Sequence, residues 1–168
     1  MNGILLVDKP GDWTSNDVVQ KLRGILHERR IGHAGTLDPM ATGLLTVFVG
    51  RATRAVEFAE ADAKRYRAAL RLGPTTDTQD ITGTVLRQEA PDMTREALEQ
   101  ALKGFRGEIR QIPPMYSAVK VNGERLYKLA RRGETVERAA RTVTIHGLDL
   151  LGREGEDWIL DIRCSKGT

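Results

Sequence analysis

The segment Arg65–Leu72 limits the possible folds more than any other, because apolar and basic residues alternate along it. Successive side chains of a β-strand point to opposite faces of its sheet. The alternation therefore predicts a half-buried strand with a basic outer face. The apolar positions are Tyr66, Ala68, Leu70 and Leu72, and the basic positions are Arg65, Arg67 and Arg71.

Other segments extend this pattern of short strands interrupted by helices. Thr14 and Asp17 have the spacing of a capping box before apolar residues at helical spacing, and Thr94 can cap a second helix. A short third helix is predicted at 125–132, ending at Gly133. Because strands outnumber helices, we predict an α+β fold with a mixed, largely antiparallel sheet. Further strands are expected at 4–7, 44–49, 84–87, 143–151 and 158–164, the last with an unpaired edge.

Composition narrows the class of protein. With 168 residues, 40% apolar residues and 17 glycines, the chain has the size and composition of one globular domain. A single cysteine and three scattered histidines argue against disulfides and metal clusters. No apolar run approaches the ~18 residues of a membrane span, and the start MNGILLVDKP lacks the features of a secretion signal. These observations predict a cytoplasmic protein without cofactor or metal.

Positive charge is concentrated in one part of the chain. The net charge is only +3, but residues 103–132 contain 8 basic and 2 acidic side chains. Clustering of this kind suits a phosphate backbone. A solvated helix face explains the charge pattern equally well.

The segment 32–45, with the sequence GHAGTLDPMATGLL, is the strongest candidate for a reactive site. Its glycines allow close backbone approach, but no Gly-Lys-Ser/Thr follows, so it is not a phosphate-binding P-loop. Asp38 has two interpretations. It can cap a helix that starts at Pro39, or it can be a nucleophile held between apolar neighbours and paired with a cation.

Six blocks of the sequence, in order, resemble the TruB family of tRNA pseudouridine synthases. The resemblance begins at Lys9-Pro10 with Trp13-Thr14-Ser15 and includes 32–45 as the catalytic motif. The next block comprises Lys64-x-Tyr66-x-Ala68, Leu72-Gly73 and the residues Thr76-Asp77-Thr78-x-Asp80-x-x-Gly83. It continues with Gln111-x-Pro113-Pro114-x-Tyr116-Ser117-Ala118-x-Lys120, with Leu126-Tyr127-x-x-Ala130-Arg131-x-Gly133 and with Cys164-Ser165-Lys166-Gly167-Thr168.

The resemblance implies that the T-loop uridine of tRNA, position 55, is isomerised to pseudouridine after it has been flipped out of the loop. Asp38 would be the nucleophile, either attacking the sugar C1′ or assisting departure of the uracil anion. His33 would enter the space that the base leaves, with Gly35 and Thr36 beside the substrate. Tyr66, which core packing alone would also explain, would be a catalytic residue that stacks on the uracil and whose hydroxyl can reach a proton. Asp80, otherwise a turn residue, would help to anchor a catalytic arginine.

The resemblance also assigns partners. Lys9, Lys64, Lys120, Arg131 and Arg132 are candidate phosphate contacts for the T-arm stem-loop, each with solvated charge as the alternative. Tyr116 and Lys120 are as well suited to bracing the fold as to touching RNA. No membrane or metal partner is expected, and the full-length form is expected to be a monomer.

One departure from the family pattern bears on activity. The family's third motif continues past Lys-Gly-Thr into Tyr-Ile-Arg, whose arginine pairs with the catalytic aspartate. Residues 1–168 are therefore expected to be a catalytic domain truncated inside this motif, without the C-terminal RNA-binding domain, and inactive alone. Two other functions are considered: a non-catalytic RNA-binding or RNA-folding module, and an aspartate-dependent glycosidase or nucleosidase, which requires a second carboxylate.

Overall fold

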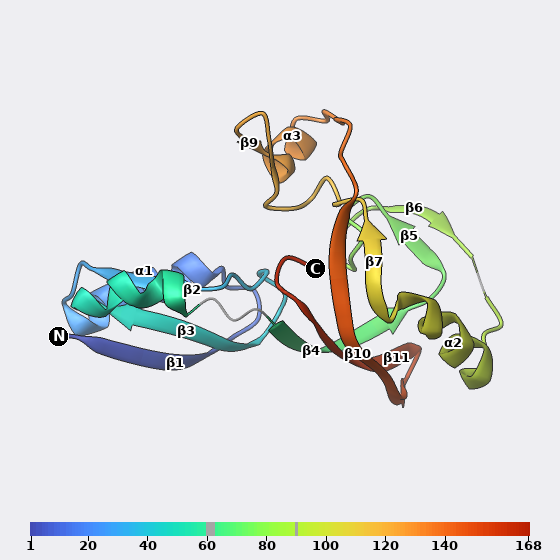
Figure 1. Cartoon of the computed structure of the whole chain (residues 1–168), viewed down its shortest axis with the longest axis horizontal. Helices are drawn as coiled ribbons and strands as arrows, with labels where there is room; N and C mark the ends of the chain where they lie inside the picture. The colour runs from blue at the N-terminus through green and yellow to red at the C-terminus, as the bar shows by residue number, and fades with distance from the viewer. Residues whose placement is uncertain (60–62, 90) are drawn as a thin grey trace. The chain divides into compact units, whose positions relative to one another are not determined.

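The computed structural model describes residues 1–59, 63–89 and 91–168 (Figure 1). They divide into two compact units, Met1–Ala61 and Asp62–Thr168. Each unit has its own cluster of buried apolar side chains. The expectation of one catalytic domain over 1–168 stays a prediction.

The N-terminal unit contains a three-stranded antiparallel sheet in the order β1-β3-β2. The strands are β1 (Gly3–Lys9), β2 (Ile31–Ala34) and β3 (Gly43–Val49), and the 3-10 helix η1 (Gly50–Phe58) follows them. Helix α1 (Ser15–Leu26) packs on the sheet through Val18 and Val19. The sheet contributes Ile31, Leu45, Val47 and Val49 to this core.

Helix α1 begins where the sequence predicts. Thr14 Oγ1 accepts a hydrogen bond of 3.0 Å from the Asp17 N–H, and the Asp17 carboxylate accepts one of 2.8 Å from the Thr14 N–H. These two bonds complete the predicted capping box. Strand β2 was not predicted, because its four residues include Gly32 and His33 and give no alternating pattern.

The C-terminal unit is built on a four-stranded sheet in the order β4-β11-β10-β7. Its strands are β4 (Ala63–Arg71), β7 (Gly107–Gln111), β10 (Arg141–Glu154) and β11 (Asp157–Ser165). Helix α2 (Arg95–Leu102) packs on this sheet through Leu98 and Leu102, and η2 (Lys103–Phe105) follows it. Strand β11 pairs with β4 on one side and β10 on the other. The expected unpaired edge at the last strand is therefore wrong.

Two small hairpins complete the C-terminal unit. One pairs β5 (Pro74–Thr76) with β6 (Val85–Gln88), and the other pairs β8 (Lys120–Val121) with β9 (Glu124–Arg125), followed by α3 (Leu126–Arg131). Every strand pair in the described residues is antiparallel. The predicted α+β class with a largely antiparallel sheet is confirmed.

The arginines on the outer face of β4 bind acidic residues of the β10–β11 hairpin. Arg65 lies 2.7 Å from Asp161, Arg67 lies 2.6 Å from Glu154, and Arg71 pairs with both Glu156 and Asp157. These hydrogen bonds hold the pKa values of Asp157 and Asp161 below their usual range. The face predicted to be basic is therefore largely neutralised.

No helix among the described residues is both long enough and apolar enough to span a bilayer.

Candidate active site

The segment between β2 and β3 carries Asp38 and its sequence neighbours. Gly35 (φ 75°) and Gly43 (φ 114°) adopt left-handed backbone conformations that favour glycine over other residues. His33 Nδ1 lies 2.7 Å from the Gly35 carbonyl oxygen. Because a carbonyl only accepts, Nδ1 carries the proton in this bond. His33 thus lies in β2, and Gly35, Thr36 and Asp38 follow it on the connection to β3.

Asp38 opens a tight turn. The Ala41 N–H donates a 3.1 Å hydrogen bond to the Asp38 carbonyl, and no helix follows Pro39. Asp at the first and Pro at the second position are typical of such a turn. The interpretation of Asp38 as a helix cap is therefore wrong.

The surroundings of Asp38 also differ from the prediction. Leu37 packs into the core of the unit, whereas Asp38 and Pro39 are exposed. The expected apolar enclosure of the carboxylate does not form within the N-terminal unit. Among the described residues, the carboxylate has no side-chain hydrogen bond or ion pair.

Lys9 supports this turn from below the surface. Its side chain is fully buried, with 0% exposure. Its Nζ donates to the carbonyl oxygens of Pro10, Trp13 and Pro39 at 2.8, 2.6 and 3.1 Å. All three amine protons are engaged. The prediction that Lys9 contacts a phosphate is therefore wrong, because no proton of the amine remains free and no part of it reaches solvent.

Ser15 supports the same segment and was missed as a functional residue. It is 2% exposed, and its hydroxyl bonds both the N–H of Leu37 at 3.0 Å and the C=O of Leu37 at 3.3 Å. The sequence places Ser15 next to a helix cap. That position gives no sign of a partner 22 residues away.

In the C-terminal unit, Lys64 and Tyr66 lie on the same face of β4. Their cross-strand partners on β11 are Cys164 and Ile162, respectively. Tyr66 is 38% exposed and does not belong to the buried cluster of this sheet. Core packing therefore does not account for it. An exposed aromatic ring on a rigid strand is suited to stacking on a planar ligand.

Asp80 organises the connection between β5 and β6. Its Oδ1 accepts hydrogen bonds from the Thr78 hydroxyl at 2.9 Å and from the N–H and hydroxyl of Thr82 at 2.8 and 2.6 Å. Partial burial raises the pKa of Asp80, but the hydrogen bonds from Thr82 and Thr78 outweigh burial and hold the pKa below its usual value. Asp80 is therefore an anion at neutral pH and can still accept from a cation.

The basic side chains around α3 differ in how they are paired. Arg132 bonds Glu124 at 2.6 and 3.1 Å and Glu134 at 2.6 Å, and these bonds raise its pKa. Among the residues that the structure describes, Lys120 and Arg131 form no ion pair. The Arg131 guanidinium lies 5.3 Å from the centre of the Tyr127 ring. Two carboxylates already bind Arg132, so it is the least available of the phosphate candidates. Lys120 and Arg131 keep a positive charge that no carboxylate of the described residues neutralises.

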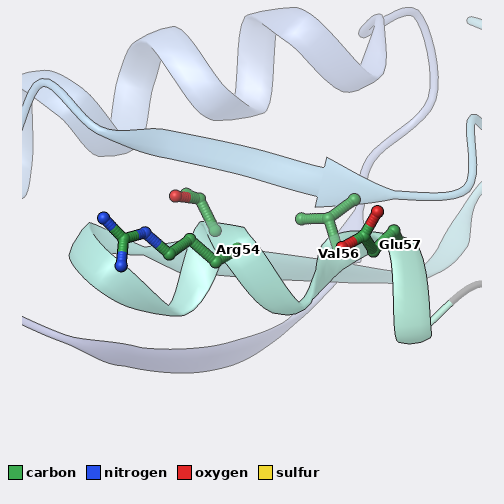
Figure 2. Close-up of a pocket in the computed structure, with 4 residues that line it drawn as sticks. Arg54, Val56 and Glu57 are labelled. Carbon is green, nitrogen blue, oxygen red and sulfur yellow. The ribbon is translucent and has the colours of Figure 1, made fainter.

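Surface hollows elsewhere do not include the candidate residues. One is lined by Thr53, Arg54, Val56 and Glu57 of η1 (Figure 2), and another by Arg23, His27, Glu28 and Arg29 near the end of α1. In Figure 2 the Arg54 side chain extends away from Val56 and Glu57. Neither hollow is lined by residues of the Asp38 turn.

Comparison with known proteins identifies relatives along the whole chain. Residues 23–168 match the N-terminal domain of the TruB family pseudouridylate synthases. The chain is 49% identical over 168 residues to tRNA pseudouridine synthase B of Azoarcus sp. and 46% identical to that of Yersinia pestis. It spans about half the length of these relatives, 56% and 52%.

Solved structures agree with this assignment. A crystal structure of a Cbf5-Nop10-Gar1 complex superimposes with a TM-score of 0.74 at 31% identity, covering 99% of this chain and 40% of the other. An H/ACA RNP bound to a substrate RNA containing 2'-deoxyuridine superimposes with a TM-score of 0.68 at 26% identity, covering 99% of this chain and 38% of the other.

Proposed function

Because the chain belongs to the TruB family of pseudouridylate synthases, we propose that the full-length protein isomerises the T-loop uridine of tRNA to pseudouridine. The family match over 23–168 carries this proposal. In the reaction the N1–C1′ bond breaks, the uracil turns while bound, C5 bonds to C1′ and loses its proton, and N1 takes up a proton. Atoms and electrons balance within the nucleotide, so the step needs no redox partner and no net water.

Asp38 is the nucleophile in this proposal. Its carboxylate is exposed, and the backbone on both sides of it is bonded to the buried Lys9 and Ser15. A group that is free at its reacting atoms and fixed at its backbone is preorganised for attack. The carboxylate either attacks C1′ or assists departure of the uracil anion.

Three other residues receive roles in the same proposal. Tyr66 offers an exposed ring on which the flipped uracil stacks. His33 enters the space that the base leaves, and Gly35 and Thr36 lie beside the substrate. Asp80 keeps its negative charge at neutral pH and anchors the catalytic arginine that follows the Lys-Gly-Thr motif in the family.

The T-arm of tRNA is the proposed partner. Lys64, Lys120 and Arg131 are the phosphate contacts that we retain, and Arg132 contributes only if it leaves its two carboxylates. We propose that the full-length protein is a monomer and acts in the cytoplasm, where the lone cysteine remains reduced.

The proposal is tested by product analysis. Residues 1–168 replace the matching part of the Azoarcus relative, and this full-length chimera is incubated with a T-arm stem-loop. The expected product is pseudouridine in the intact RNA, detected by nucleoside mass spectrometry. The purified 168-residue chain is the control and is expected to give no turnover. Release of free uracil would instead support a nucleosidase, and an unchanged RNA would contradict the proposal.

A non-catalytic RNA-binding or RNA-folding module is the second candidate. The unbalanced charge of Lys120 and Arg131 favours RNA binding whether or not chemistry follows. This alternative predicts that Asp38→Asn leaves every function of the protein intact.

A further inference from the structure

Ser15 holds the backbone of the residue that precedes Asp38. Its hydroxyl accepts from the Leu37 N–H at 3.0 Å and donates to the Leu37 C=O at 3.3 Å. The side chain of Leu37 packs into the core of the N-terminal unit. Leu37 is therefore held at its N–H, its carbonyl and its side chain.

Pro39, the residue after Asp38, is fixed by a different side chain. The Pro39 carbonyl accepts a 3.1 Å hydrogen bond from the fully buried Lys9 amine. Asp38 lies between these two attachments with its own side chain exposed. The direction of the carboxylate is thus set by its neighbours rather than by bonds to the carboxylate itself.

Ser15 is itself fixed by the start of α1. It is the first residue of the helix, and the Thr14–Asp17 capping box determines where that helix begins. Ser15 is 2% exposed, so it has no contact with solvent that an RNA could replace. Among the residues that the structure describes, the backbone of Leu37 is the one polar partner of its hydroxyl.

We propose that Ser15 is a positioning residue, which orients Asp38 by fixing Leu37. This inference rests on the proposed function, because the orientation of the Asp38 carboxylate matters only if that carboxylate takes part in a reaction. Reactive groups need placement within a fraction of an ångström, and a misplacement of ~1 Å costs about a hundredfold in rate.

The test compares three variants of the full-length chimera. Ser15→Ala removes the hydroxyl, and Ser15→Cys replaces it by a slightly larger, weakly bonding thiol. Thr53→Val is the matched control, since it removes a hydroxyl that donates to the Gly50 carbonyl at 2.8 Å in the same unit. We expect kcat to fall about tenfold to a hundredfold in both Ser15 variants. KM stays within about twofold.

A second readout is independent of activity. Amide hydrogen exchange of residues 35–41 is expected to accelerate in both Ser15 variants, while exchange of β3 remains as in the unmodified chimera. If Ser15→Ala fails to fold, Ser15→Cys carries both measurements, because it leaves no cavity.

Several results would overturn the inference. Unchanged kcat in both Ser15 variants, an increase in KM alone, or an equal loss in Thr53→Val would each contradict positioning. If Asp38→Asn is inactive while the Ser15 variants are fully active, the inference is wrong and the proposed function stands. If Asp38→Asn remains active, the proposed function fails and the inference fails with it.

Discussion

The amine of Lys9 donates a 3.1 Å hydrogen bond to the carbonyl of Pro39, 30 residues later in the chain. This bond joins the end of β1 to the turn that carries Asp38. Two more bonds, to Pro10 and Trp13, complete the coordination of the amine. A lysine of the first sequence block therefore supports the turn that carries Asp38, and its amine is not available to a ligand.

Replacing Lys9 by Met tests this role. The three backbone carbonyls that accept from the buried amine lose their donor, so we expect the free energy of unfolding to fall by about 1–3 kcal/mol. The salt dependence of tRNA binding is expected to stay unchanged, because Lys9 contacts no phosphate. Urea unfolding and binding titrations measure the two quantities. A reduced salt slope with unchanged stability would restore Lys9 as a phosphate contact.

The paired and unpaired cations near α3 predict different salt effects. Lys120→Ala is expected to reduce the slope of log affinity against log salt concentration by about 1. Arg132→Ala is expected to change the slope less, since Glu124 and Glu134 already neutralise its charge. Binding of tRNA to the full-length chimera at several salt concentrations measures both. A flat salt response in the unmodified protein would assign this charge to a solvated face.

Asp80 predicts a dependence of stability on pH. Its pKa is lowered in the folded state, so the carboxylate stabilises the fold above the ordinary value of 3.8. That contribution is lost as the pH falls below 3.8 through the lower folded-state pKa.

The matching variant is Asp80→Asn. It is expected to unfold more easily at pH 7, by about 1 kcal/mol or less because the group is largely exposed. The difference from the unmodified chain is expected to shrink near pH 3. Urea unfolding of both proteins at pH 7 and near pH 3 measures this difference in the free energy of unfolding. An equal difference at both would show that the charge of Asp80 contributes nothing.

Local sequence signals predicted the elements whose causes are local. The capping box at Thr14, the alternation along β4 and the apolar run of β3 each led to the right element. The order β4-β11-β10-β7 could not be predicted, because strand partners such as Ala63 and Ser165 lie about a hundred residues apart in the chain and no local pattern encodes them. For the same reason the last strand was expected at an edge and lies in the middle of its sheet.

The candidate site divides in the same way. The left-handed glycines at 35 and 43 fit the glycine-rich motif, whereas the exposure of Asp38 differs from the apolar enclosure that the motif suggested. The burial of Lys9 and the bond from Ser15 to Leu37 depend on tertiary contacts. Lysine is rarely buried, so its type alone favoured a surface role over a structural one.

The most direct test of the account is a single-turnover measurement on Asp38→Asn in the full-length chimera. The substitution keeps the size of the side chain and removes its charge. We expect pseudouridine formation to be lost, with tRNA affinity within about threefold of the unmodified protein because the phosphate contacts remain. Turnover at the unmodified rate would contradict the assignment of Asp38 as the nucleophile.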